Sequence, residues 1–412
     1  MNEQEKLDRL VELGIELNKV QDLDILLERV LLEARTFTNA DAGSIYIREE
    51  DMLHFTYTQN NTLQKQLPEG EKLIYSTFRI PIDSTSMAGH VAVTGQMLNL
   101  ADAYIVQPQA PFKFSRQFDQ ATGYKSKSVC TIPLNTSRGD ILGILQLINA
   151  QDHNNDIVSF SPKDEALMFH FASIASVALE RAKMNRRTFL RMLRMSDLRD
   201  TKETGAHVNR VGAFAVELYE RWAIKHQVPQ NTVERNRDIL RIAAMMHDVG
   251  KVGISDLILK KPGRYNHDEF EIMKQHTILG ARLFLDVQSE YDEASFQVTF
   301  NHHERWDGNG YPGYVDVASG EPIPGYTLPD GRPKGKKGKE IPLFARIVFV
   351  VDVFDALSTE RCYKKAWDET RVLGVIKESA GKQFDPELVD LFLSGYQSFK
   401  AIQNRYAEDD VC

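Results

Sequence analysis

The sequence predicts two domains of different fold class, an α+β domain followed by an all-α domain. A chain of 412 residues is too long for one ordinary hydrophobic core. The first part alternates helical and strand-like segments, whereas the part from Thr201 onward has helical apolar spacing and no convincing run of alternating strands. We therefore expect domains at residues 1–165 and 201–401, joined by a helical connector at residues 166–200.

The first domain begins with residues 4–36, whose apolar positions recur at helical spacing around a break at "QDLD". Five strand candidates follow: "GSIYI", "MLHFTYT", "MLNLAD", "SVCTIPL" and "ILGILQLIN". A helix, several strands and a closing helix predict a mainly antiparallel sheet.

The connector starts at a Ser-Pro pair, Ser161 and Pro162, which is typical of a helix N-terminus. The predicted helix becomes strongly basic after Arg181. Two interpretations stay open, a solvated surface face and a rigid connector that dimerises the chain.

The second domain contains the helical segments "VERNRDILRIAAMMHDVG", "DEFEIMKQHTILGARLFLDV" and "ETRVLGVIKESAG". Residues 315–340 are rich in Gly, Pro and Lys and predict a loop. This loop is either a tolerated insertion or a lid that alters substrate choice or partner docking. Its lysines at 334, 336, 337 and 339 would attract an anion.

Composition narrows the functional classes. Fifty basic and 58 acidic side chains give a net charge of 50 − 58 = −8, which argues against broad electrostatic binding to DNA or to an anionic membrane. The N-terminus is charged, and no apolar run approaches the ~18 residues that span a bilayer, so we expect a cytoplasmic protein. Cys130, Cys362 and Cys412 form no CxxC pair, so a metal would be held by nitrogen and oxygen.

Seven of the 11 histidines fall between His207 and His303, in a pattern with several carboxylates. Glu203 and His207 are four residues apart, which places them on one helix face. Other candidates end apolar stretches or lie on amphipathic helices: His247, Asp248, His276, His302, His303 and Asp352.

These candidates amount to five histidines and three carboxylates, too many donors for one tetrahedral zinc ion. They suit two or three divalent ions bridged by Asp248. Mixed imidazole and carboxylate ligation is typical of iron, manganese or nickel.

The segments "HDVGKVGISDLILKKPG", "MKQHTILG", "HHERWDGNGYPG", "IPLFARIVFVVDVFDALSTERCYKKA" and "GKQFDPELV" resemble the HD-GYP family of the HD phosphohydrolase superfamily. The resemblance covers residues 201 to about 392, in family order. The family usually passes from GYP to "IPL" in a short turn, and the 315–340 loop departs from that pattern.

The resemblance implies metal-dependent hydrolysis of cyclic di-GMP, a bacterial second messenger, to pGpG or GMP. The family's metal ligands match His247, Asp248, His276, His302, His303 and Asp352, and Glu203 and His207 match the trinuclear type. We expect iron or manganese. Catalytic roles fall to the bridging Asp248 and to Lys251, which matches a phosphate-contacting position together with Arg361 and Lys364. In the family the GYP turn is a docking surface for a signalling protein.

The first domain is similar to GAF domains, a sensory fold that often binds small ligands, in its element order and in "INAQDHNNDIVSFSPKDEAL". That segment is close to the NKFDE pattern of cyclic-nucleotide-binding GAF domains through Asn149, Phe160, Asp164 and Glu165. The pattern's lysine is Ala150 here, which argues against nucleotide binding and leaves the GAF ligand unnamed. Cys130 is interpreted as a buried apolar filler.

Together these patterns predict a cytoplasmic, homodimeric, GAF-regulated cyclic di-GMP phosphodiesterase for signal transduction. One alternative is a hydrolase of a mixed cyclic GMP-AMP dinucleotide, which presents the same diester. Another is a non-catalytic nucleotide receptor, against which the complete ligand set argues. A di-iron oxygenase would use similar ligands, but Lys251, Arg361 and Lys364 argue against it.

Overall fold

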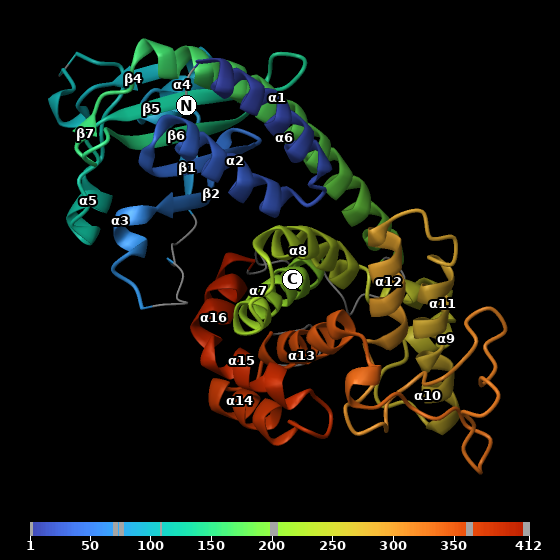
Figure 1. Cartoon of the computed structure of the whole chain (residues 1–412). Coiled ribbons are helices and arrows are strands. Elements are labelled where there is room, and N and C mark those ends of the chain that lie inside the picture. Colours follow the sequence, from blue (N-terminus) through green and yellow to red (C-terminus); the bar gives the residue numbers. More distant parts are fainter. Residues whose placement is uncertain are drawn as a thin grey trace. The chain divides into compact units, whose positions relative to one another are not determined.

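The computed structural model describes residues 3–68, 73, 78–107, 109–197, 205–359 and 366–406, with the backbone alone for residues 3–7 and 193–197. The chain divides into two compact units, residues 1–187 and 188–412 (Figure 1). The predicted sites Glu203, Arg361 and Lys364 lie outside the described residues. No described helix has the length and apolar content needed to cross a membrane.

The first unit is built on a curled antiparallel sheet with the strand order β3-β2-β1-β6-β5-β4, and β7 pairs with β6. The strands are β1 (Ala40–Glu49), β2 (Met52–Asn60), β3 (Arg79–Pro81), β4 (Leu98–Leu100), β5 (Val129–Asn135), β6 (Ile141–Gln151) and β7 (Ile157–Val158). The helices are α1 (Glu3–Lys19), α2 (Leu23–Thr38), α3 (Asn61–Gln64), α4 (Met87–Thr94), α5 (Gln117–Thr122) and α6 (Pro162–Asp197), with a 3-10 turn η1 (Ala103–Ile105). The predicted α+β class is confirmed.

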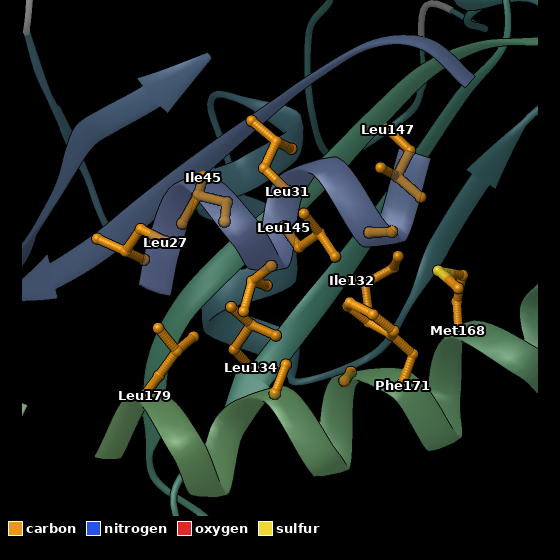
Figure 2. Close-up of a cluster of buried hydrophobic side chains, with 14 of the residues drawn as sticks. Leu27, Leu31, Ile45, Ile132, Leu134, Leu145, Leu147, Met168, Phe171 and Leu179 are labelled. Atoms are coloured by element: carbon orange, nitrogen blue, oxygen red, sulfur yellow. The ribbon is translucent and has the colours of Figure 1, made fainter. Parts of the chain in front are cut away.

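Alternation along the strands gives the sheet two apolar faces. Ile45 on β1 packs with α2 and α6, where Leu31 and Phe171 belong to the same buried cluster (Figure 2). The next residue, Tyr46, belongs to a different cluster, with Val91 of α4. Successive side chains of a strand point to opposite faces, so α2 and α6 cover one face of the sheet and α4 the other.

The second unit is helical, and within its described residues there are isolated β-bridges but no strands. Its helices are α7 (Gly205–Lys225), α8 (Gln230–Met245), α9 (Asp256–Leu259), α10 (His267–Lys274), α11 (His276–Arg282), α12 (Glu290–Asn301), α13 (Leu343–Ser358), α14 (Glu369–Glu378), α15 (Pro386–Ser394) and α16 (Tyr396–Arg405), with 3-10 turns η2 (Val249–Gly253) and η3 (Gly338–Glu340). A core of apolar side chains from α7, α8, α12 and α13 to α16 holds them together. The predicted all-α class is confirmed.

The expectation of one helix across "DEFEIMKQHTILGARLFLDV" is wrong, because the segment forms α10 and α11 with a break at Gln275. The turn η2 packs directly on the start of α11 beside this break. A Cβ atom at Gly250 would lie 1.9 Å from the carbonyl oxygen of His276. The close approach of these two backbones therefore requires glycine at position 250.

Candidate metal centre

Helix ends position most of the candidate ligands. His247 and Asp248 follow α8, His276 is the first residue of α11, and His302 caps α12 with His303 after it. His207 lies in the first turn of α7, and Asp352 lies within α13. These segments are far apart in sequence, but α8, α12 and α13 share one core, which brings their polar residues together.

The structure gathers seven of the eight predicted ligands into two groups. Asp248, His276, His302 and His303 form one group, and His207, His247 and Asp352 form the other, with candidate ligand atoms in each group within 4.8 Å of one another. His247 adjoins both groups, since its Nε2 lies 3.2 Å from Asp248 Oδ2 and 3.8 Å from Asp352 Oδ1. The eighth, Glu203, is outside the described residues.

Hydrogen bonds on the far side of the rings fix the orientation of the histidines. Nδ1 of His247 lies 2.8 Å from Ala244 O, and Nδ1 of His276 lies 2.7 Å from Met273 O. Nδ1 of His302 lies 3.1 Å from both Val298 O and Thr299 O. A carbonyl oxygen can only accept, so each Nδ1 carries the proton and each Nε2 keeps its lone pair for the cluster.

The carboxylate of Asp248 lies at the centre of the first group. Its Oδ1 is 3.2 Å from His276 Nε2 and 3.5 Å from His302 Nε2, and this buried atom accepts no hydrogen bond from the described part of the chain. Burial alone would raise the pKa of Asp248, but Lys251, whose Nζ is 2.7 Å from Oδ2, and His247 hold that pKa well below its usual range. A buried, ionised and incompletely bonded carboxylate fits a cation.

His302 and His303 are arranged as neutral ligands. Burial lowers the pKa of both imidazoles, that of His303 well below its usual value. The ring of Tyr311, from the turn that contains the cis peptide Tyr311-Pro312, lies 4.8 Å from the ring of His303. The backbone N–H of Tyr311 also donates to His303 O at 3.2 Å.

Two residues that we did not predict support His207. Asp355, which is 0% exposed, lies 2.7 Å from His207 Nδ1 and accepts from Arg210 Nε at 2.5 Å. Burial alone would raise the pKa of Asp355, but His207 and Arg210 lower it to about 2. Asp355 therefore orients the imidazole of His207, as carboxylates commonly do behind a metal-bound histidine. The sequence does contain one indication of Asp355: it lies three residues after Asp352 and therefore on the same side of α13.

Glu304, which is 2% exposed, is a further buried carboxylate beside the site. Burial raises the pKa of Glu304 to about 7. Hydrogen bonds from the backbone of Gly313 and Lys336, and the charge of Lys336, act in the opposite direction and lower that pKa. Burial also lowers the pKa of the Lys336 amine.

The donor set fits divalent metal ions. Five histidines and two carboxylates converge from the described residues, and three of the rings have their Nε2 lone pairs directed inward. Nitrogen and oxygen donors in this mixture suit iron or manganese. No described cysteine takes part, because Cys130 is buried in the core of the first unit and burial raises the pKa of its thiol to about 12.

The first unit contains a second candidate site, a cavity of about 510 Å³. Its described lining comes from the strands that face α4, from α4 and from residues 113–119, and includes Tyr46, Phe55, Phe78, Met87, Phe114 and Tyr124. The residues that match the NKFDE pattern do not line it. Instead, Asn149 donates to Lys125 O at 2.8 Å and Asp164 accepts from Ser161 N at 2.8 Å, so both serve the local fold.

Comparison with protein families assigns both units to known domain classes. A GAF domain model matches residues 22–179, and an HD domain model matches residues 204–357, with a second HD model at residues 329–388. The chain therefore combines an N-terminal GAF domain with an HD domain.

Several curated proteins are similar to this chain in sequence. A "Cyclic di-GMP phosphodiesterase" of Vibrio cholerae is 32% identical over 219 residues, 52% of this chain and 40% of that protein. A "3'3'-cGAMP-specific phosphodiesterase 2" of the same organism is 32% identical over 203 residues, 49% of this chain and 33% of that protein. The "Cyclic di-GMP phosphodiesterase response regulator RpfG" of Xanthomonas campestris is 32% identical over 249 residues, 60% and 58% respectively. The chain thus spans 33–58% of the length of these relatives.

Among solved structures, the GAF domain of an Acinetobacter phosphoenolpyruvate-protein phosphotransferase matches 45% of this chain and 98% of its own, at 17% identity and a TM-score of 0.33. A GAF domain/HD domain protein from Geobacter sulfurreducens matches 41% of this chain and 98% of its own, at 13% identity and a TM-score of 0.29.

Proposed function

We propose that this chain hydrolyses cyclic di-GMP to pGpG, GMP or both at a centre of two or three divalent metal ions, under control of its GAF domain. The observation that carries the proposal is the convergence of seven nitrogen and oxygen ligands in two adjoining groups. The names of the relatives that share the HD domain support the cyclic dinucleotide as substrate.

The reaction breaks a bond between phosphorus and a ribose oxygen. Oxygen of a water molecule forms the new bond to phosphorus, and the departing ribose oxygen takes up a proton. Bound metal ions would supply Lewis acidity and a water molecule of lowered pKa. We assign the ligand role to His207, His247, Asp248, His276, His302, His303 and Asp352, with iron or manganese as the metal.

Side chains of this protein would bridge the two groups of ligands and neutralise the charge of the phosphate. Asp248 lies where it can bridge the two groups, since one of its oxygens faces His247 and the other faces His276 and His302. Lys251, held by Asp248 at 2.7 Å, can neutralise a phosphate oxygen that approaches the centre. Arg361 and Lys364 are proposed as further phosphate contacts.

Glu203 is proposed as a ligand of a third ion together with His207. Replacing Glu203 by Ala is then expected to lower the metal content from three ions per chain to two. Metal analysis of the purified variant decides this, and an unchanged content would refute the third site.

The experiment that tests the activity uses full-length protein purified without oxygen. Metal analysis and cyclic di-GMP turnover are measured in the same sample, with the products resolved by chromatography. We predict that D248A abolishes turnover, by at least about 10³-fold, because it removes the bridging carboxylate. The matched control is D390A, which removes an exposed carboxylate of the same unit. Full activity of a folded D248A variant would contradict the metal mechanism.

The mixed cyclic GMP-AMP dinucleotide is the second candidate substrate, favoured by the names of two relatives. Competitive turnover of the two dinucleotides by one sample separates these candidates. Binding of either one with metal present and no turnover would instead indicate a nucleotide receptor.

We also propose a cytoplasmic homodimer with a signalling partner at the GYP turn. Sedimentation of the full-length chain tests the dimer. Capture of cell proteins on wild-type chain and on a Y311A variant tests the partner.

Regulation would act through the cavity of the GAF domain. The described lining carries two charged side chains, Lys113 and Asp119, and Asp119 already accepts from Tyr104 Oη at 2.6 Å and from Ser126 N and Oγ, each at 2.8 Å. Such a lining favours an uncharged, mainly apolar and aromatic ligand over a phosphate ester.

The neutral dye N-phenyl-1-naphthylamine tests this assignment in the full-length protein. Its fluorescence is expected to rise with wild-type chain and with V93W, which alters an exposed position of α4. A88W, which fills the cavity from the same helix, is expected to remove the signal. Displacement of the dye by cyclic GMP would contradict the assignment.

A further inference from the structure

The 315–340 segment is tied back onto the segment that carries His302 and His303. Tyr314 N donates to Lys334 O at 2.9 Å, directly after the GYP turn. A Cβ atom at Gly335 would lie 2.3 Å from Gly308 O, so the two backbones are in close contact. Residues 334–337, which we name the return segment, therefore pack against the chain between His303 and Gly313.

One buried carboxylate joins these two stretches. Glu304 Oε1 accepts from Gly313 N at 2.5 Å, and its Oε2 accepts from Lys336 N at 3.1 Å. Glu304 is 2% exposed, so the two backbone donors replace water at both of its oxygens.

The ionised form of Glu304 needs an opposite charge nearby, because an isolated buried carboxylate is costly. The positive charge of Lys336, in the return segment, favours that ionised form from a distance, without a direct ion pair. The Lys336 ammonium group donates to Asn301 Oδ1 at 2.5 Å and lies 4.5 Å from the centroid of the Phe300 ring, so it is held inside the domain.

Glu304 is connected to the metal centre through the GYP turn, because it accepts a hydrogen bond from Gly313 N at the end of that turn. Gly313 is two residues beyond Tyr311, whose ring packs on His303 at 4.8 Å. His303 itself precedes Glu304 directly. Holding Gly313 therefore holds the turn that places the Tyr311 ring against this imidazole.

We propose that Glu304 and Lys336 are a pair of positioning residues through which the 315–340 segment holds Tyr311 and His303 in place at the metal centre. The inference rests on the proposed metal centre, and it assigns the insertion a role within that centre.

The test measures Mn²⁺ affinity of metal-free full-length protein by titration, with free Mn²⁺ followed by electron paramagnetic resonance. The variants are E304Q, K336M and the double variant, with K339M as the control at an exposed lysine. H303A identifies which class of Mn²⁺ sites includes His303. Circular dichroism of each variant checks that the helices are intact.

Each single variant is expected to weaken that class of sites about tenfold, the effect typical of partners behind a metal ligand. E304Q leaves the lysine without its counter-charge, and K336M leaves the carboxylate without it. The double variant leaves neither charge unbalanced and keeps an oxygen for Gly313 N, and the loss of the acceptor for Lys336 N is the same as in E304Q. It is therefore expected to bind no more weakly than the weaker single variant, while the sites insensitive to H303A stay unchanged.

Wild-type affinity in both single variants would overturn the proposal. A double variant with about a hundredfold weaker Mn²⁺ affinity would also overturn it, because that is the product of two independent effects. An equal loss of affinity at both classes of sites would overturn it too, because a general structural defect would cause such a loss. Mn²⁺ binding without turnover in the wild-type chain would refute the proposed hydrolysis and leave this test intact. A wild-type chain that takes up no Mn²⁺ would overturn both.

Discussion

At the scale of single residues, the hydrogen bond made by Nδ1 of a histidine sets whether its Nε2 is available as a metal ligand. His207 differs from His247, His276 and His302, because its Nδ1 faces the carboxylate of Asp355 and not a backbone carbonyl. The same carboxylate also compensates the buried Arg210. One side chain thus supports a candidate ligand and the stability of the domain.

The variant D355N is expected to destabilise the second unit by about 3 kcal/mol, because the guanidinium group of Arg210 stays buried without its counter-charge. Metal affinity of the His207 group should also fall about 10- to 100-fold, since the imidazole loses the partner that orients it. Denaturant unfolding and metal titration measure these two effects. D390N, at an exposed position, is the control, and a D355N variant with wild-type metal affinity would exclude the orienting role.

Cys130 gives a prediction of pH dependence. Its thiol is 1% exposed, and burial raises its pKa to about 12 in the folded chain. An unfolded thiol ionises near pH 8.5, so above that pH the unfolded state binds fewer protons and the free energy of unfolding falls, by at most about 1.4 kcal/mol per pH unit from this group.

The variant C130A should show a smaller loss of stability between pH 8.5 and 10 than the wild-type chain, whatever its stability at pH 7. Urea unfolding at several pH values measures the slope. Equal slopes would mean that the thiol ionises as readily in the folded chain.

The candidate ligands could be singled out from the sequence, whereas the contacts of their supporting residues could not. His247, Asp248, His302 and His303 stand in short motifs whose spacing already suggests chemistry. Arg210 and Asp355 are 145 residues apart, and Glu304 is 32 residues from Lys336, and no periodicity links either pair. Their partners become visible only when the helices have packed.

At the scale of elements, specific hydrogen bonds determine where a helix begins and ends. Asp22, which is buried, caps α2 by accepting from Asp24 N at 2.9 Å and Ile25 N at 3.1 Å. This cap separates α2 from α1 at the break that "QDLD" predicted.

The variant D22A is expected to lower the free energy of unfolding of the first unit by about 1 kcal/mol, the usual cost of a lost N-cap. Chemical denaturation followed by circular dichroism gives this value. D22N, which keeps an acceptor oxygen, should recover most of it, and a loss as large in D22N would point to the charge and not to the cap.

The long strands were predicted correctly, whereas two short strands and one interrupted helix were not. Strands β1, β2, β5 and β6 form where strands were expected, as does the short β4, but β3 and β7 have three and two residues, too few for a pattern. The apolar period across residues 268–287 is continuous, whereas the break at Gln275 accompanies a tertiary contact with Gly250, which local sequence does not encode.

At the scale of the whole molecule, each unit has its own apolar core. Leu147 belongs to the core between the sheet, α2 and α6, and Phe354 to the core of the helical unit. Phe354 is fully buried and packs against the rings of Phe214, Phe392 and Phe399.

The variant F354A is therefore expected to destabilise the helical unit by about 3–5 kcal/mol and to leave the first unit unchanged. L147A should do the reverse, at a cost of about 2–5 kcal/mol. Hydrogen exchange followed by mass spectrometry reports both units in one sample. Faster exchange across both units in either variant would show that they unfold together.

The carbonyl groups behind His247, His276 and His302 belong to the last turns of α8, α10 and α12. The C-terminal end of a helix carries about half a negative charge, and each such end favours a nearby cation by roughly 0.3–1 kcal/mol. The negative ends of three helices therefore lie behind three of the candidate ligands, and part of the attraction for a cation comes from the backbone. A D248N variant would keep this contribution together with the imidazole ligands and Asp352, so the cation affinity that it retains is an upper limit on what the backbone provides.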